Sequence, residues 1–258
     1  MLRKGLKKEG QVTLFIIFGI LIVGAIVALF MILPKPETGE GLKKDPYRMV
    51  QKCLADKLND ALPLFQEQGG YFNPLDYIIY EDGRVAYYCY TSEKKEICLR
   101  NDALFKPRLE EEIRRKLANG VEECFNDLVE SEGGYDVSLG QTDFSIEILP
   151  DTIIAKIKKE VVISRGGEEP VKYSNFDVSV NSPLFDFIRI ANEILNQEVS
   201  CNCPDESCLA DVVGLMRENR DYKITFSLGS RYETVYTLKD FYGTNVFNFA
   251  IKNCDKTL

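Results

Sequence analysis

The chain has 258 residues, of which 45% are hydrophobic and 28% charged, and its formal net charge is −8 at pH 7. This composition excludes a wholly disordered chain, because there is enough apolar material to form a core. The negative charge argues against nucleic-acid binding, which needs a basic surface. The absence of histidine removes Ser-His-Asp and Cys-His nucleophile pairs and His-ligated zinc sites.

The N-terminus combines a basic segment with a long apolar stretch. Residues 1–10 carry four lysine or arginine residues and one acid, and residues 12–33 contain no charge. Those 22 residues would extend about 33 Å as a helix, enough to cross a bilayer. The run is longer than the apolar core of a removable signal peptide, and no small-residue cleavage site follows it. We therefore expect a retained single-pass transmembrane helix over residues 11–33, with residues 1–10 in the cytoplasm.

Residues 34–46 follow the apolar stretch and hold three prolines and two glycines. They predict a tether, because proline and glycine end helices. The residues beyond position 33 then lie outside the cytoplasm, and they carry 28 basic and 39 acidic side chains. Such a surface suits solubility, cations or basic partners.

The first part of the outer domain, residues 47–134, predicts a helix, a hairpin and a second helix. The first helix starts after Pro46 and ends at Gly69-Gly70, and its apolar residues recur every three or four positions. The second begins near Pro107 and ends at Gly133-Gly134. The stripe of the first is Val50, Leu54, Leu58, Ala61 and Phe65, and that of the second is Leu109, Ile113, Leu117, Val121, Cys124 and Leu128. Between them, residues 77–80 and 85–90 predict a β-hairpin with a type I′ turn centred on Asp82-Gly83.

The two helices resemble each other and predict an internal helix–Gly-Gly–strand repeat. Residues 50–53 align with residues 121–124 at an offset of 71, and residues 69–71 align with 133–135 at an offset of 64. The second helix is thus shorter by about two turns between its cysteine and its glycines, so the apolar face keeps its phase. Chance similarity between two amphipathic helices is the alternative.

The second part, residues 135–258, predicts antiparallel sheets and a helix. Alternating apolar and polar residues run through 135–139, 144–149, 153–157, 161–164 and 171–180, which favours an antiparallel meander with one buried face. A helix starts after Ser182-Pro183, a short one is expected over residues 209–218, and strands over 222–228, 232–238 and 246–251 close the chain. The fold class is α+β.

All eight cysteines follow the apolar stretch, and an even count in an exported domain favours disulfides. Cys53 with Cys124 would cross-link the two repeat helices, and Cys89 with Cys98 would close a local loop. The remaining cysteines are Cys201, Cys203, Cys208 and Cys254. Four thiolates could instead hold zinc, but paired C-x2-C knuckles are missing, so disulfides are favoured over a metal.

The sequence offers no recognisable catalytic or cofactor site. Its glycine pairs lack the spacing of a P-loop or a dinucleotide fingerprint. Its acids occur as contiguous runs that point to different sides of a helix. We expect no catalytic residue, no cofactor and no metal.

The segment Lys7-Lys-Glu-Gly10-Gln11-Val-Thr-Leu-Phe15-Ile-Ile17 resembles the class III signal of archaeal type IV pilins and pilin-like proteins. The resemblance implies that a prepilin peptidase cuts between Gly10 and Gln11, and that the mature helix joins a pilus-like assembly. Phe15 stands where the family often has glutamate, and prolines break the helix at positions 34 and 36. A filament subunit and a permanent anchor therefore both remain open.

The motif QVTLFIIxGI, followed by a cysteine-bearing helix and Gln-Gly-Gly-Tyr, also looks like a group of uncharacterised single-span surface proteins of archaea. The likeness covers residues 1–35 and 47–72 and implies no activity. We expect a non-enzymatic cell-surface protein, pilin-like or stalked, for adhesion, binding or envelope structure, with the lipid bilayer and an unknown surface protein or glycan as partners. The alternative is an extracytoplasmic enzyme or enzyme accessory that uses carboxylates or a Cys-bound metal.

Overall fold

The computed structural model describes residues 19, 21–23, 45–91, 98–100, 106–167, 169–200, 214–215, 217, 219–230 and 233–252. It divides into two units, Met1–Lys43 and Lys44–Leu258. Within the described ranges no helix is long and apolar enough to cross a membrane. The span expected over residues 11–33 lies almost wholly outside those ranges, as do Gly10 and Gln11. The larger unit is α+β, as expected.

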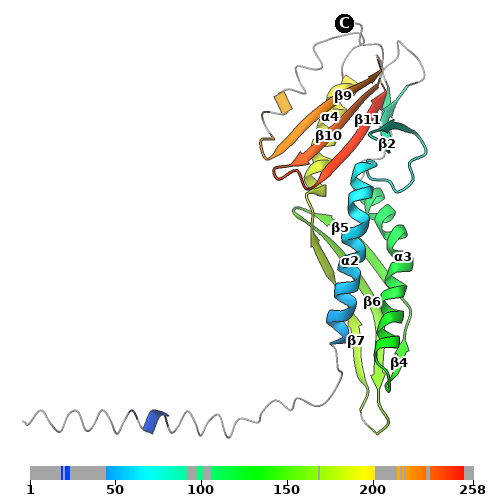
Figure 1. Ribbon diagram of the computed structural model, residues 1–258, viewed down its shortest axis with the longest axis vertical. Helices are drawn as coiled ribbons and strands as arrows, with labels where there is room; N and C mark the ends of the chain where they lie inside the picture. Colours follow the sequence, from blue (N-terminus) through cyan, green and yellow to red (C-terminus); the bar gives the residue numbers. More distant parts are fainter. Residues whose placement is uncertain are drawn as a thin grey trace, which may run out of the picture. The chain divides into compact units, whose positions relative to one another are not determined.

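Two helices lie side by side and cover one face of a sheet in the larger unit (Figure 1). They are α2 (Pro46–Glu67) and α3 (Lys106–Ser131). The Asp45 side chain accepts a hydrogen bond from the Tyr47 amide and caps α2, which satisfies one free amide of the first turn. The expected stripes face inward, except that Leu62 is buried where Ala61 was expected and Ala61 is only half-buried.

The sheet beneath these helices is antiparallel and consists of five strands. Its centre is β6 (Thr152–Ser164), a single strand where two separate runs were expected. One edge is formed by β4 and β5, which pair with successive stretches of β6, and the other by β7 and β8. Their bounds are Asp136–Leu139, Asp143–Leu149, Val171–Asn175 and Val178–Asn181. The expected break at residues 158–160 does not occur, because Lys159 continues the buried face.

The other sheet joins the first hairpin to the closing strands, in the order β1-β2-β11-β10-β9, with β3 also paired to β2. The bounds are Tyr77–Tyr80 for β1, Gly83–Tyr90 for β2, Leu99–Arg100 for β3, Tyr222–Ser230 for β9, Glu233–Asp240 for β10 and Val246–Lys252 for β11. The β2–β11 pair is parallel, so this sheet is mixed and the expectation of purely antiparallel sheets is wrong here. Helix α4 (Leu184–Ser200) covers one face, where the Phe187 and Phe247 rings stack at 5.9 Å.

The turn of the first hairpin lies one residue earlier than expected. Tyr80 pairs with Gly83, so Glu81 and Asp82 form the two-residue loop, with φ of 45° and 65°. Two consecutive positive φ values are typical of a type I′ turn. The turn type is as expected, but Gly83 begins β2 instead of occupying the turn.

The order helix, Gly-Gly, strand occurs twice, but the two glycine pairs have different surroundings. Gly69 and Gly70 both have positive φ, and a Cβ on either would collide with Asn248 or Leu109. Neither Gly133 nor Gly134 has a neighbouring atom within 4 Å of such a Cβ. The first pair therefore makes a close contact between α2, α3 and β11.

Candidate functional site

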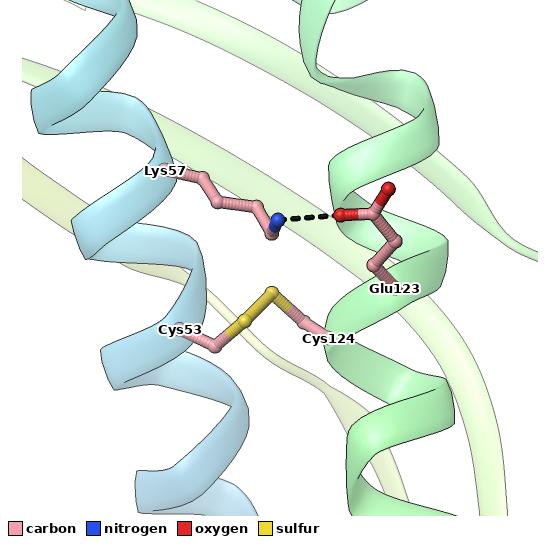
Figure 2. The surroundings of a disulfide bond; sticks show 4 residues. All are labelled: Cys53, Lys57, Glu123 and Cys124. Atoms are coloured by element: carbon pink, nitrogen blue, oxygen red, sulfur yellow. Dashed lines mark hydrogen bonds and ion pairs between the residues drawn. A yellow bond between two sulfur atoms is a disulfide. The ribbon is translucent and has the colours of Figure 1, made fainter.

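Among the residues that the structure describes, two disulfides link elements of the larger unit, and both join pairs that the sequence favours. Cys53 on α2 bonds to Cys124 on α3, across the interface of the two repeat helices (Figure 2). One turn further along α2, Lys57 forms an ion pair of 2.6 Å with Glu123. The two cysteines of this bond lie 71 residues apart in the sequence. The bond therefore closes a long loop, which strongly reduces the conformational freedom of the unfolded chain.

The second disulfide joins Cys89 in β2 to Cys98, nine residues further along the chain. Both cysteines are buried, and the bond holds the returning β3 against β2. Every cysteine within the described ranges is therefore in a disulfide. The other four, Cys201, Cys203, Cys208 and Cys254, lie outside those ranges.

A cavity of about 430 Å³ lies between the end of α2, the turn of the β1–β2 hairpin and the face of the mixed sheet opposite α4. This volume falls within the range of small-ligand sites in proteins. The lining is mixed in polarity. It consists of Leu64, Glu67, Gln68, Tyr80, Glu81, Gly83, Val85, Thr225, Thr237, Lys239, Val246 and Asn248.

The cavity floor is a row of three polar residues on adjacent strands. Thr237 of β10 is directly opposite Thr225 of β9 and Asn248 of β11. In a sheet, directly paired residues project from the same face, so the three side chains form one continuous polar row. Thr237 and Asn248 are buried, whereas Thr225 is exposed.

Hydrogen bonds hold the buried part of this row in place. The Thr237 hydroxyl donates to Asn248 Oδ1 at 2.8 Å, and Asn248 Nδ2 donates to the Glu67 carbonyl oxygen at 3.2 Å. The second hydrogen on Asn248 Nδ2 and the lone pairs of the Thr237 hydroxyl have capacity beyond these bonds. A buried polar pair beside a cavity can therefore bond a ligand without moving.

The hairpin that roofs the cavity is anchored by an apolar cluster. Val85, Tyr87, Val235 and Ala250 are buried together, and Tyr80 packs against them. Along β10 the same face thus changes from apolar Val235 to polar Thr237. This change marks the border between the domain core and the cavity.

A smaller hollow of about 90 Å³ shares Glu67 with the first and is lined by Asn59, Asn181, Thr244 and Asn245 among others. The last two belong to the β10–β11 turn, in which the Asp240 carboxylate accepts from the amides and side chains of Thr244 and Asn245. Partial burial acts to raise the pKa of Asp240, but these hydrogen bonds outweigh it and lower the pKa. The turn exposes Phe241 and Tyr242 to solvent, with 79% and 85% of their surfaces accessible.

A buried lysine lies on the face of β6 beneath α3. Lys159 donates to Glu122 Oε2 at 2.8 Å and to Thr142 Oγ1 at 2.5 Å. Its Nζ also lies 5.0 Å from the centre of the Phe125 ring. The hydrogen bond from Lys159 lowers the pKa of Glu122. The pair joins β6 to α3, and the Lys159 ammonium meets both a carboxylate and an aromatic ring of that helix.

Sequence reasoning did not identify the cavity. Its floor consists of residues from three strands. In each strand the polar residue fits the usual alternation of side chains between the two faces of a sheet. The sequence does contain one indication of it, Asn248 within the otherwise apolar run Val246–Ile251. A buried amide needs hydrogen-bond partners, so this asparagine indicates a polar site.

Within the described ranges, no three Cys, Asp or Glu side chains are grouped so that they could hold a metal ion. Comparisons with protein-family models, with curated proteins and with solved structures find no match.

Proposed function

We propose that the chain is a non-enzymatic cell-surface protein, anchored by one N-terminal membrane helix, whose outer unit binds a ligand in the cavity beside α2. The observation that carries this proposal is the pair of disulfides, Cys53–Cys124 and Cys89–Cys98. Disulfides persist in extracytoplasmic compartments and are rare in the cytoplasm. They support an outer location for residues 44–258, with the basic residues 1–10 on the cytoplasmic side.

The cavity supports binding more than catalysis. The charged residues of its lining are Glu67, Glu81 and Lys239, and its floor consists of hydroxyl and amide groups. A rigid polar floor with an apolar side is instead typical of a site that orients a bound molecule.

The test of the proposal is the thiol state of the native protein. The full chain, isolated without reductant and alkylated under denaturing conditions, should show no alkylation at Cys53, Cys124, Cys89 or Cys98. Alkylation at these four positions in freshly isolated protein would contradict the outer location. Stoichiometric zinc with eight free thiols would favour a metal-dependent enzyme or accessory instead.

The N-terminal resemblance adds a second part to the proposal, processing by a prepilin peptidase between Gly10 and Gln11. Cleavage removes all four basic residues of the leader and leaves an apolar end, which allows a subunit to leave the bilayer for a pilus-like assembly. Without cleavage, moving each charge to the membrane centre costs about 2.5–3.5 kcal/mol, so the protein stays anchored. Intact-mass analysis decides: a mature start at Gln11 supports the pilin-like form, and a start at Met1 alone rejects it.

A further inference from the structure

We infer that the ligand of the cavity beside α2 is a neutral saccharide, bound by hydrogen bonds to the Thr225–Thr237–Asn248 row. This inference rests on the proposed function, because it names the ligand class of the binding site proposed there.

The floor selects a ligand that carries several hydroxyl groups. Thr225, Thr237 and Asn248 are in register across three strands, so their groups repeat at the strand spacing of about 4.8 Å. Thr225 Oγ1 makes only a long contact, 3.5 Å, with the Thr237 carbonyl oxygen. Its hydroxyl is therefore available to a ligand as both donor and acceptor. A purely apolar ligand would leave the buried Thr237–Asn248 pair facing it without new partners, which is unfavourable.

The walls add an apolar surface and two carboxylates. Tyr80, Leu64 and Val246 line the cavity together with the polar floor, and Leu64 keeps 45% of its surface exposed. A sugar ring has C–H groups on its faces and hydroxyls around its edge, so it matches an apolar wall beside a polar floor. Carboxylates such as Glu67 and Glu81 accept strong hydrogen bonds from hydroxyls.

Charge argues against an anionic ligand. Two glutamates and one lysine, Lys239, are among the residues that line the cavity, and the whole chain is negative. A phosphate or an acidic peptide would meet net repulsion there. The size of the cavity, about 430 Å³, suits one or two sugar units and excludes a folded protein segment.

The experiment is saturation-transfer difference NMR on the full chain, in a detergent without a sugar headgroup. The probes are glucose, galactose, mannose, N-acetylglucosamine, and the disaccharides maltose, cellobiose, lactose and diacetylchitobiose. At least one should receive saturation from the protein. Thr225→Val, which removes one hydroxyl from an exposed strand position, should weaken its affinity roughly three- to tenfold. Thr225→Arg should abolish binding by filling the cavity.

The matched controls are Ser179→Val and Ser179→Arg, at an exposed position of β8 in the other sheet. Both should leave binding unchanged, and thermal unfolding should show that all four variants fold. The inference is overturned if no sugar receives saturation, if Thr225→Arg binds as well as the unaltered protein, or if a tetralysine peptide binds more tightly than every sugar. A negative result here leaves the thiol test of the proposed function unaffected, so the two can fail separately.

Discussion

Gly69 lies so close to Asn248 that a Cβ built on the glycine would be 2.9 Å from the Asn248 backbone oxygen. Gly69 also has a φ of +73°, and the Tyr88 hydroxyl donates to its carbonyl oxygen at 2.6 Å. The end of α2 is thereby fixed against β11, the strand that contributes Asn248 to the cavity floor.

Gly69→Ala should therefore lower the free energy of unfolding by about 2–4 kcal/mol, since left-handed backbone strain and a steric clash add together. The matched control is Gly243→Ala, because Gly243 has a nearly identical φ of +71° and no atom within 4 Å of an added Cβ. It should cost only about 1–2 kcal/mol, the backbone contribution. Urea denaturation measures both. Equal losses would show that the contact with Asn248 contributes nothing.

The two disulfides should differ in their contribution to stability. The Cys53–Cys124 bond has a sequence separation of 71, and the Cys89–Cys98 bond one of 9. In the chain-entropy description, the double Cys→Ala change should cost about 4 kcal/mol for the longer loop and about 2.5 kcal/mol for the shorter. Denaturant titration of the two double variants gives the comparison. A larger loss for Cys89–Cys98 would contradict this order.

The Lys159–Glu122 pair should behave as a partly buried ion pair. The Lys159 side chain is 4% exposed, whereas that of Glu122 is 49% exposed. Glu122→Ala should cost about 1–3 kcal/mol, because the buried ammonium loses its partner. Lys159→Met should cost less, since its methylene chain already packs in the core, and the double variant should resemble Lys159→Met alone. A double-mutant cycle measures this coupling, and additive losses would disprove it.

The β10–β11 turn should become less stable in acid. The pKa of Asp240 is lowered in the folded state. The Asp240 carboxylate therefore adds to the free energy of unfolding at pH values above its ordinary pKa of about 3.9. This stabilisation is lost as the pH falls through the lower pKa of the folded state. Asp240→Asn should therefore show a weaker dependence of unfolding free energy on pH below about pH 4 than the unaltered chain. Identical slopes for the two proteins would remove Asp240 from the acid response.

Local sequence patterns predicted the helices and most strands, but they did not predict which distant strands pair. Apolar stripes located α2 and α3, and their matching cysteines predicted the bond between them. The parallel pairing of β2 with β11 joins residues more than 150 positions apart, such as Tyr87 and Ala250. A buried strand shows the same residue pattern whether its neighbour is parallel or antiparallel, so this pairing was not predictable.

Two local errors have clear physical causes. The pair Asp82-Gly83 favoured a turn centred there, but Glu81 accepts a positive φ instead, and the turn shifts by one residue. Lys159 lies between the expected runs 153–157 and 161–164, yet it continues the strand because its ammonium group donates to Glu122 and Thr142. A charged residue that is unfavourable in a buried strand, such as Lys159, is stabilised there by partners distant in sequence.

Residues 44–258 are proposed to lie outside the cytoplasm, and lysine footprinting on intact cells measures this location. Intact cells that produce the full chain are treated with a membrane-impermeant amine reagent, and labelled sites are mapped by mass spectrometry. Lys158 and Lys172 are exposed and should be labelled, whereas buried Lys159 should not, which makes it an internal control for the fold. Labelling of Lys158 and Lys172 only after the cells are permeabilised would show that the outer unit lies in the cytoplasm.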